Sequence, residues 1–243
     1  MARLVIGTSK AKTVPAVVIE KTTPEPYIEY TVANGKLTST TSRIMDFTGV
    51  TEIGVGLENA YNGNTNISGA VDMSDVQTIS SNYGCSGMFA NCTGLTSVDL
   101  SSLTSITGSY GCSNMFQGCT GLTSVDLSSL ATISSSYACI NMFSNCTNIT
   151  SINLSSLASI SGTYGCSNMF SGCTSLTSLS FPALTSTSFG TKTNQFNKML
   201  EGVTGCAVHF PSNLQSVIGS WADVTNGFGG TNTTVSFDLP ATE

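Results

Sequence analysis

The sequence has 243 residues, enough for one large domain or two small ones, and only 9% of them are charged, with a formal net charge of −6. Six of the eight Lys and Arg residues lie in the first 43 positions, and none occurs between Ile44 and Thr191. Nucleic-acid binding needs clustered Lys and Arg residues, and a membrane span needs about 20 apolar residues in a row. We therefore expect neither nucleic-acid binding nor a membrane span.

Residues 1–45 are predicted to form a basic N-terminal arm or cap without the repeat that follows. Residues 17–19 and 27–32 have the β-branched and aromatic composition of two short strands. The arm can dock on another protein or simply cap the body, and the sequence leaves both open. Only Leu4, Val5 and Ile6 follow Arg3 before a glycine, too short a run for a signal-peptide core. We therefore expect no signal peptide and a chain that starts in the cytoplasm.

Residues 46–190 repeat with a period of 27 residues, and the unit Gly111–Tyr137 represents it well. Such self-similarity indicates a solenoid, in which each unit buries its apolar face against its neighbours. The period is carried by a Met-Phe pair and by two cysteines in each unit: Met88-Phe89, Met115-Phe116, Met142-Phe143 and Met169-Phe170, with Cys85, Cys112, Cys139 and Cys166, and Cys92, Cys119, Cys146 and Cys173.

Each unit contains two apolar patterns. In the unit shown, the cysteines, Met and Phe of residues 112–119 are spaced i, i+3, i+4 and i+7, which predicts a short helix. Residues 122–127 follow the L-x-x-L-x-L pattern, with a strand at its end. The predicted fold is an α/β leucine-rich-repeat solenoid of five to six coils, with parallel strands, short helices and atypical end caps. Residues 191–243 are the predicted C-terminal cap, with strands at 207–210 and 235–239.

The residues that could carry chemistry are few. Two cysteines seven positions apart on a helix lie about 10.5 Å apart at ~1.5 Å per residue, beyond disulfide reach. Their spacing is not that of a zinc site, and His209 is the only histidine. The cysteines therefore read as buried reduced thiols. We expect no metal, cofactor or catalytic residue, and His209 reads as a capping residue.

Two polar ladders repeat with the same period and are the candidate binding residues. One is the outward strand position with its flanking serines: Asp72, Asp99, Asp126 and Asn153, with Ser97, Ser124 and Ser151. Stacked strands lie ~4.8 Å apart, so neighbouring carboxylates repel, and either water screens them or a cation or basic partner binds. The other ladder is Tyr83, Tyr110, Tyr137 and Tyr164. These rings either pack on the predicted helix that follows them, with the hydroxyl in water, or form aromatic platforms for sugars. The sequence leaves both possibilities open.

The units of the type MF-x-x-CTGLTSVDLSSLTSI resemble BspA-like leucine-rich repeats over about residues 46–190. The residues 197–221 are similar to the ends of repeat proteins from gut bacteria and their phages. The resemblance implies a non-enzymatic adhesion protein on a cell surface or phage virion, which binds a surface glycan or protein. It also implies other virion proteins as partners for the N-terminal arm. The alternative is a purely structural virion decoration or assembly protein.

Overall fold

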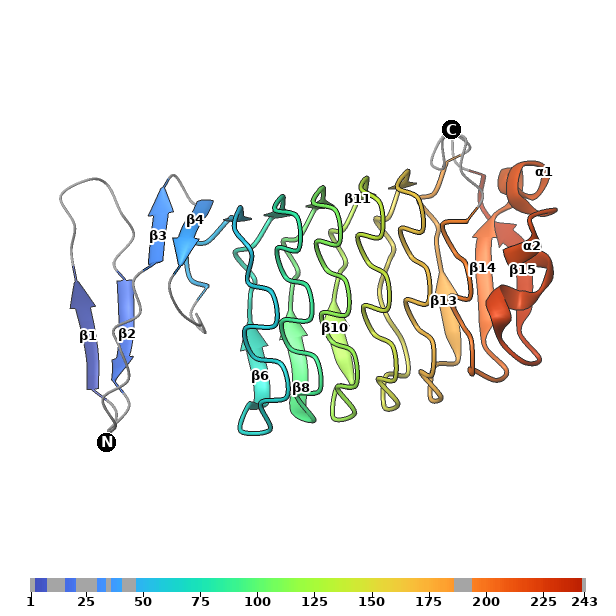
Figure 1. Ribbon diagram of the computed structural model, residues 1–243. Helices are drawn as coiled ribbons and strands as arrows, with labels where there is room; N and C mark the ends of the chain where they lie inside the picture. The colour runs from blue at the N-terminus through green and yellow to red at the C-terminus, as the bar shows by residue number, and fades with distance from the viewer. Residues whose placement is uncertain are drawn as a thin grey trace.

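A computed structural model describes residues 47–185 and 194–241, together with the backbone of four N-terminal strands. Its main body is a solenoid whose coils stack side by side, with strands that run in parallel from coil to coil (Figure 1). Each coil has a side of longer strands, a side of short two-residue strands, and a segment without strands that closes the circuit.

The longer strands form what we call the strand face. Val125 of one coil is in register with Val98 of the preceding coil, and this pairing is parallel, which confirms the predicted orientation. Seven rungs follow one another here among the described residues, two of them supplied by the strands at 207–211 and 234–239, so the body has more coils than the five to six expected. The strands are β6 (Ser68–Asp72), β8 (Gly94–Asp99), β10 (Ser124–Asp126), β13 (Ser178–Ser180), β14 (Ala207–Pro211) and β15 (Thr234–Leu239), with a bridge from Asp126 to Asn153 between β10 and β13.

The short strands stack into a second parallel sheet, which continues into the N-terminal region. There β4 pairs in parallel with β5, and β3 pairs antiparallel with β4. The expected strand at 17–19 lies within β2, and the described part of the expected strand at 27–32 lies in β3. The strands of this sheet are β3 (Tyr30–Ala33), β4 (Lys36–Thr40), β5 (Glu52–Ile53), β7 (Thr78–Ile79), β9 (Ser105–Ile106), β11 (Thr132–Ile133) and β12 (Ser159–Ile160). The strands β1 (Arg3–Gly7) and β2 (Ala16–Glu20) form a separate antiparallel pair.

The predicted short helices of the repeat are wrong. In the segment 112–119, the amides of Met115 and Gln117 donate to carbonyls three residues back, at 3.2 and 3.0 Å. The amide of Phe116, between them, donates to the carbonyl of Met142 in the next coil at 2.9 Å. An α-helix uses its amides for bonds to the fourth residue back, whereas here every second amide joins neighbouring coils. We call this chain of overlapping turns the turn ribbon: residues 83–92, 110–119, 137–146 and 164–173.

The turn ribbon needs a left-handed backbone residue at every fourth position. In one coil these are Tyr110, Asn114 and Gly118, with φ of 56°, 53° and 71°. Glycine adopts this conformation without steric cost, and asparagine tolerates it better than other residues. Both cysteines, Met and Phe of the predicted helix face are completely buried. The prediction of which residues face the core is therefore confirmed, whereas the predicted helical backbone is wrong.

The core is built of identical side chains stacked from coil to coil. Phe89, Phe116, Phe143 and Phe170 are fully buried, with ring centroids 5.4–5.8 Å apart and nearly parallel planes. Parallel rings at this separation are offset-stacked, which adds about 0.5–1.5 kcal/mol per pair to the gain from burial. Regular side-chain stacking of this kind requires every coil to have the same length, which is the physical reason for the strict 27-residue period.

The helices of the described residues lie together at the C-terminal end of the solenoid (Figure 1). They are η1 (Ser212–Leu214), α1 (Gln215–Ile218), α2 (Ala222–Thr225) and η2 (Gly227–Gly229). They bury Leu214, Ile218 and Phe228 completely, and the Phe228 ring lies 5.6 Å from that of Phe196. A solenoid exposes its core at each end unless an irregular element covers it, and these helices cover the last coils.

Candidate functional site

The strand face carries a shallow groove of about 690 Å³ that crosses four coils. The structure brings together there all seven strand-face residues singled out from the sequence. The walls are completed by Ala70 and by the valines of the three strands β6, β8 and β10. The full lining is Ala70, Val71, Asp72, Ser97, Val98, Asp99, Ser124, Val125, Asp126, Ser151 and Asn153. The parallel register is the cause, since it sets equivalent residues of successive coils side by side.

The acidic ladder has a structural role that the sequence analysis missed. Oδ1 of Asp99 accepts a hydrogen bond from the amide of Ser101 at 2.9 Å, and Asn153 accepts one from Ser155 at 3.0 Å. The same bond occurs at Asp72 and Asp126. Asp and Asn commonly accept a bond from the backbone two residues on, which forms a local turn. The repeated D-x-S and N-x-S sequence was the signal for these turns.

The groove is electronegative, because three carboxylates line it and no Lys or Arg does. Hydrogen bonds from the side chain and the backbone of Ser74 hold the pKa of Asp72 below its ordinary value of 3.8, so this carboxylate stays charged at neutral pH. Within the described ranges no three His, Cys, Asp or Glu side chains gather closely enough to hold a metal ion. A ligand of this groove would meet hydrogen-bond acceptors from the carboxylates and both donors and acceptors from the serines.

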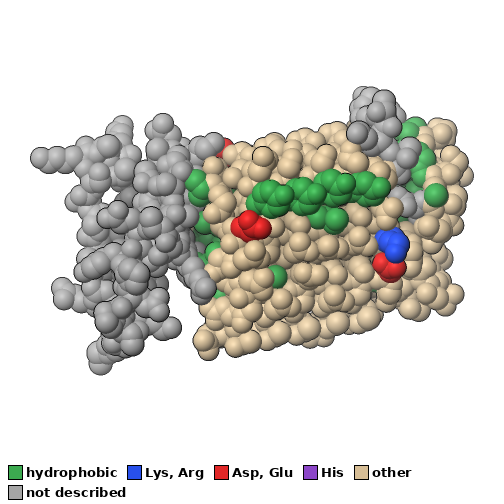
Figure 2. Space-filling view, viewed as in Figure 1, with side chains coloured by type: hydrophobic (Ala, Val, Ile, Leu, Met, Phe, Trp, Pro, Cys, Tyr) green, Lys and Arg blue, Asp and Glu red, His purple; other side chains and the backbone are tan. Residues whose placement is uncertain are grey.

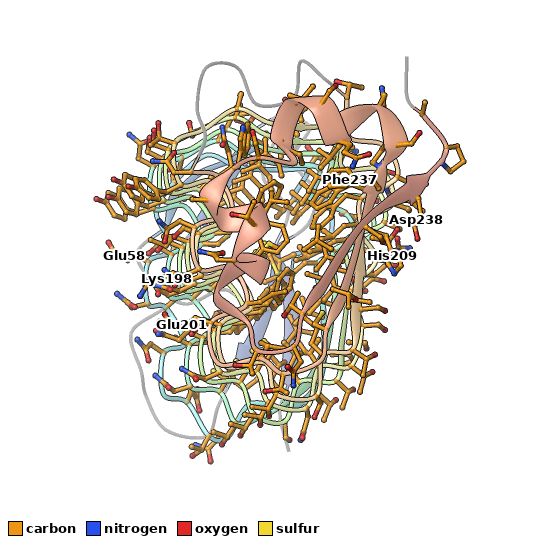
Figure 3. The ribbon with its side chains drawn as sticks, turned by 90° about the vertical axis from the view of Figure 1, so that its right-hand side faces the viewer. Glu58, Lys198, Glu201, His209, Phe237 and Asp238 are labelled. Carbon is orange, nitrogen blue, oxygen red and sulfur yellow. The ribbon has the colours of Figure 1, made fainter. Side chains whose placement is uncertain are left out.

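The same ladder continues toward the C-terminus, where it includes His209. Ser180 is in register with His209, and His209 with Ser236. The sequence analysis treated His209 as a capping residue, and the near-repeat spacing of 29 residues from Ser180 was the signal that would have placed it here. Figure 3 shows His209 and Asp238 on the strand side of the coil.

His209 contacts a hydroxyl and a carboxylate but not in the arrangement of a catalytic triad. Its Nδ1 lies 3.0 Å from Oγ of Ser236 and 3.0 Å from the carboxylate of Asp238. A triad needs the hydroxyl on one ring nitrogen and the carboxylate on the other, whereas both partners here share one nitrogen. The contact also holds the pKa of Asp238 below its ordinary value, mainly through the hydrogen bond with His209. These side-chain contacts of His209 link β14 to β15.

The tyrosine ladder lies on a different side of the coil and is not part of the groove. Its four rings stack face to face, with centroids 5.0, 4.9 and 5.4 Å apart and planes within 12° of parallel. Tyr83, at the first coil of the ladder, is 44% exposed, and the other three are half-buried. Figure 2 shows a continuous apolar strip across a surface that is otherwise polar.

The nine cysteines are all buried, unpaired thiols. The second thiol of each unit donates a hydrogen bond across the coils. Sγ of Cys119 lies 3.0 Å from the carbonyl of Phe89, and Sγ of Cys146 lies 3.0 Å from that of Phe116. Burial raises the pKa of Cys119 to about 12. The sequence argument placed these thiols in the core correctly, although the helix on which its distance estimate depended does not form.

Comparison with known families decides the identity of the repeat. The model of the BspA type leucine rich repeat region matches residues 51–201 in six copies, which is more than half of the chain. The chain belongs to the BspA-type leucine-rich-repeat family. The match covers the strand face from β6 to β13, the tyrosine ladder and the eight cysteines of the repeat units. No curated protein and no solved structure matches the chain. Of the described helices, none has the length and apolar character needed to cross a membrane.

Proposed function

We propose that this BspA-type repeat protein is a non-enzymatic recognition protein whose strand face binds an extended glycan or protein. The groove that crosses four coils is the observation that carries the proposal. Membership in a repeat family suited to protein interaction or adhesion supports it. The groove offers the same acceptors and hydroxyls once per coil, at a rung spacing of ~4.8 Å, and such repetition suits a ligand that is itself extended.

We further propose that the protein works at a virion or cell surface and that the basic arm, residues 1–45, is its attachment end. The arm holds six of the eight Lys and Arg residues, so it suits an acidic partner such as another surface or virion protein. Its side chains and most of its residues lie outside the described part of the chain. The charge division between arm and body supports separate roles for the two ends.

Binding to whole cells and to a glycan array tests the groove. Each contact is weak on its own, so Asp99→Asn should reduce binding slightly, while Asp72→Asn, Asp99→Asn and Asp126→Asn together should abolish it, because contacts in register add through effective concentration. Asparagine is the informative replacement, since Asn153 already makes the same turn bond. The matched control is Tyr110→Asn with Tyr137→Asn, which changes a different side of the coil and should bind a soluble monovalent ligand as the wild type does.

Truncation tests the arm. Deleting residues 1–43 should leave ligand binding intact and remove attachment of the protein to its particle or cell. Full binding by the triple asparagine variant would refute the groove as the site. If the intact protein binds no cell, glycan or protein and is found only as a fixed component of a particle, the purely structural alternative is correct.

A further inference from the structure

The tyrosine ladder is held in a backbone conformation that tyrosine disfavours. Tyr83, Tyr110, Tyr137 and Tyr164 have φ between 55° and 58°. At the other two left-handed positions of the same turn ribbons, the chain uses only Gly or Asn, as at Asn114 and Gly118. A bulky residue at positive φ is strained, and it persists only where the surrounding structure imposes that conformation on it.

The tyrosine ladder is not a row of platforms for sugars. A sugar stacks on the open face of an aromatic ring, and each inner ring of the ladder has a neighbouring ring on both faces at 4.9–5.4 Å. What the ladder presents to solvent is therefore a strip of ring edges with hydroxyl groups. Tyrosine edges of this kind, rigid and amphipathic, are typical of protein–protein interfaces.

The charges beside the strip are opposite at its two ends. Glu58 belongs to the coil before Tyr83, because the amides on either side of it bond to the carbonyls of Gly84 and Ser86. Lys198 belongs to the coil after Tyr164, because the amide of Asn168 bonds to the carbonyl of Asn197. Both are exposed, and Lys198 is the only Lys or Arg whose side chain the structure describes. They lie on the same side of the coil, opposite His209 and Asp238 (Figure 3).

We propose that the tyrosine strip is the interface for a second copy of this chain, docked face to face with its solenoid axis antiparallel. A two-fold axis across the middle of the strip brings the ring edges of one copy against those of the other. Both ladders have the same rung spacing, so they stay in register along all four coils. The same operation sets Glu58 of each copy beside Lys198 of the other. Lys198 already pairs with Glu201 at 2.9 Å, and its ammonium group has further donors for a second carboxylate.

The arrangement fits the distribution of charge on the body. The three carboxylates of the groove belong to the strand face, which includes His209, and Figure 3 shows His209 on the side of the coil opposite Glu58 and Lys198. The carboxylates therefore do not face each other across this interface. The strip consists of only four partly exposed tyrosines, whereas a standard interface buries about 800 Å² per partner. We therefore expect a weak dimer that forms in a concentration-dependent equilibrium. Two grooves then point outward on opposite sides. This inference is independent of what the groove binds.

Sedimentation equilibrium of the full chain over a concentration series from micromolar to about millimolar is the first measurement, and it should reveal a monomer–dimer equilibrium. Tyr110→Asn with Tyr137→Asn should weaken dimerisation by at least about tenfold, while its unfolding transition shows that it is folded. Asn is suited to these positions because it already occupies left-handed sites of the ribbon. The matched control, Asp99→Asn with Asp126→Asn in the groove, should dimerise like the wild type.

A mixing experiment tests the antiparallel arrangement. Glu58→Lys alone and Lys198→Glu alone should each weaken self-association by about tenfold, because each sets like charges opposite one another twice. An equimolar mixture of the two variants should recover dimers of mixed composition, detected by native mass spectrometry. A monomeric wild type throughout the series, tyrosine variants that dimerise normally, or a mixture that fails to recover would each overturn the proposal.

Discussion

At the scale of single residues, the turn ribbon fixes which side chains each coil accepts. Gly118 has φ of 71°, and a Cβ atom there would lie 2.5 Å from Oδ1 of Asn91 in the preceding coil. The next pair along the solenoid repeats this contact, with Gly172 below Asn145. Asparagine and glycine thus alternate from coil to coil at this position, because the side-chain amide of each asparagine occupies the space that a Cβ atom of the next residue in the stack would need.

We predict that Gly118→Ala lowers the free energy of unfolding by about 1–3 kcal/mol, from left-handed strain together with the clash. Asn91→Gly should recover part of that loss in the double variant, since it removes the amide that the new methyl group meets. Urea denaturation of the two single variants and the double variant measures the coupling. Strictly additive effects would mean that the two side chains do not meet.

At the scale of the element, the first four rungs of the strand face each end in a turn that their own Asp or Asn closes, at Asp72, Asp99, Asp126 and Asn153. The hydrogen bonds from Ser74 stabilise the charged form of Asp72 and lower its pKa below 3.8 in the folded state. A carboxyl with a depressed folded pKa contributes stability at pH values above its unfolded pKa, and this contribution is lost as the pH falls through the folded value. Repulsion from Asp99, its neighbour in register, opposes this stabilisation.

We predict that the wild type loses more stability than Asp72→Asn as the pH falls from about 5 to about 3. Asparagine retains an oxygen acceptor for the amide of Ser74 and does not titrate. Urea denaturation of both proteins at each pH gives the difference, and its size should be small because Asp72 is exposed to solvent. A variant that is equally or more sensitive to acid would show that repulsion along the ladder outweighs the turn bonds.

At the scale of the whole molecule, the solenoid encloses one continuous core whose thiols report on its integrity. The cysteines lie in successive coils from Cys85 to Cys206, and all are buried. Burial raises the pKa of Cys85 to about 12 and that of Cys206 to about 11. The thiolate is the reactive form of cysteine, so both burial and the raised pKa suppress reaction in the folded protein.

Iodoacetamide at about pH 8 should therefore modify none of the nine cysteines in the native protein and all nine after denaturation. Intact-mass spectrometry counts the added groups. The native, unreduced protein should also show no mass losses of the kind that disulfides produce. Reaction of a subset of thiols before the unfolding transition would locate coils that open independently, and a disulfide would contradict the reduced ladder.

The sequence by itself determined what depends on period and polarity. The 27-residue repeat established the solenoid, the buried ladder of Cys, Met and Phe, and the parallel alignment that brings Asp72, Asp99 and Asp126 together. The BspA-like resemblance also came from these residues. Such features could be predicted because a repeated unit must place equivalent side chains at equivalent depths, whatever backbone conformation carries them.

Only the tertiary structure decided the backbone of the Met-Phe segment and the relation between the two ladders. The bond from Phe116 to Met142 spans 26 residues, and no local propensity reveals that it replaces a helical bond. The same stacking covers the inner tyrosine faces, adds His209 to the strand-face ladder, and sets groove and tyrosine strip on different sides of the coil. Bonds between coils fix all of these features, because each coil takes its conformation from its neighbours.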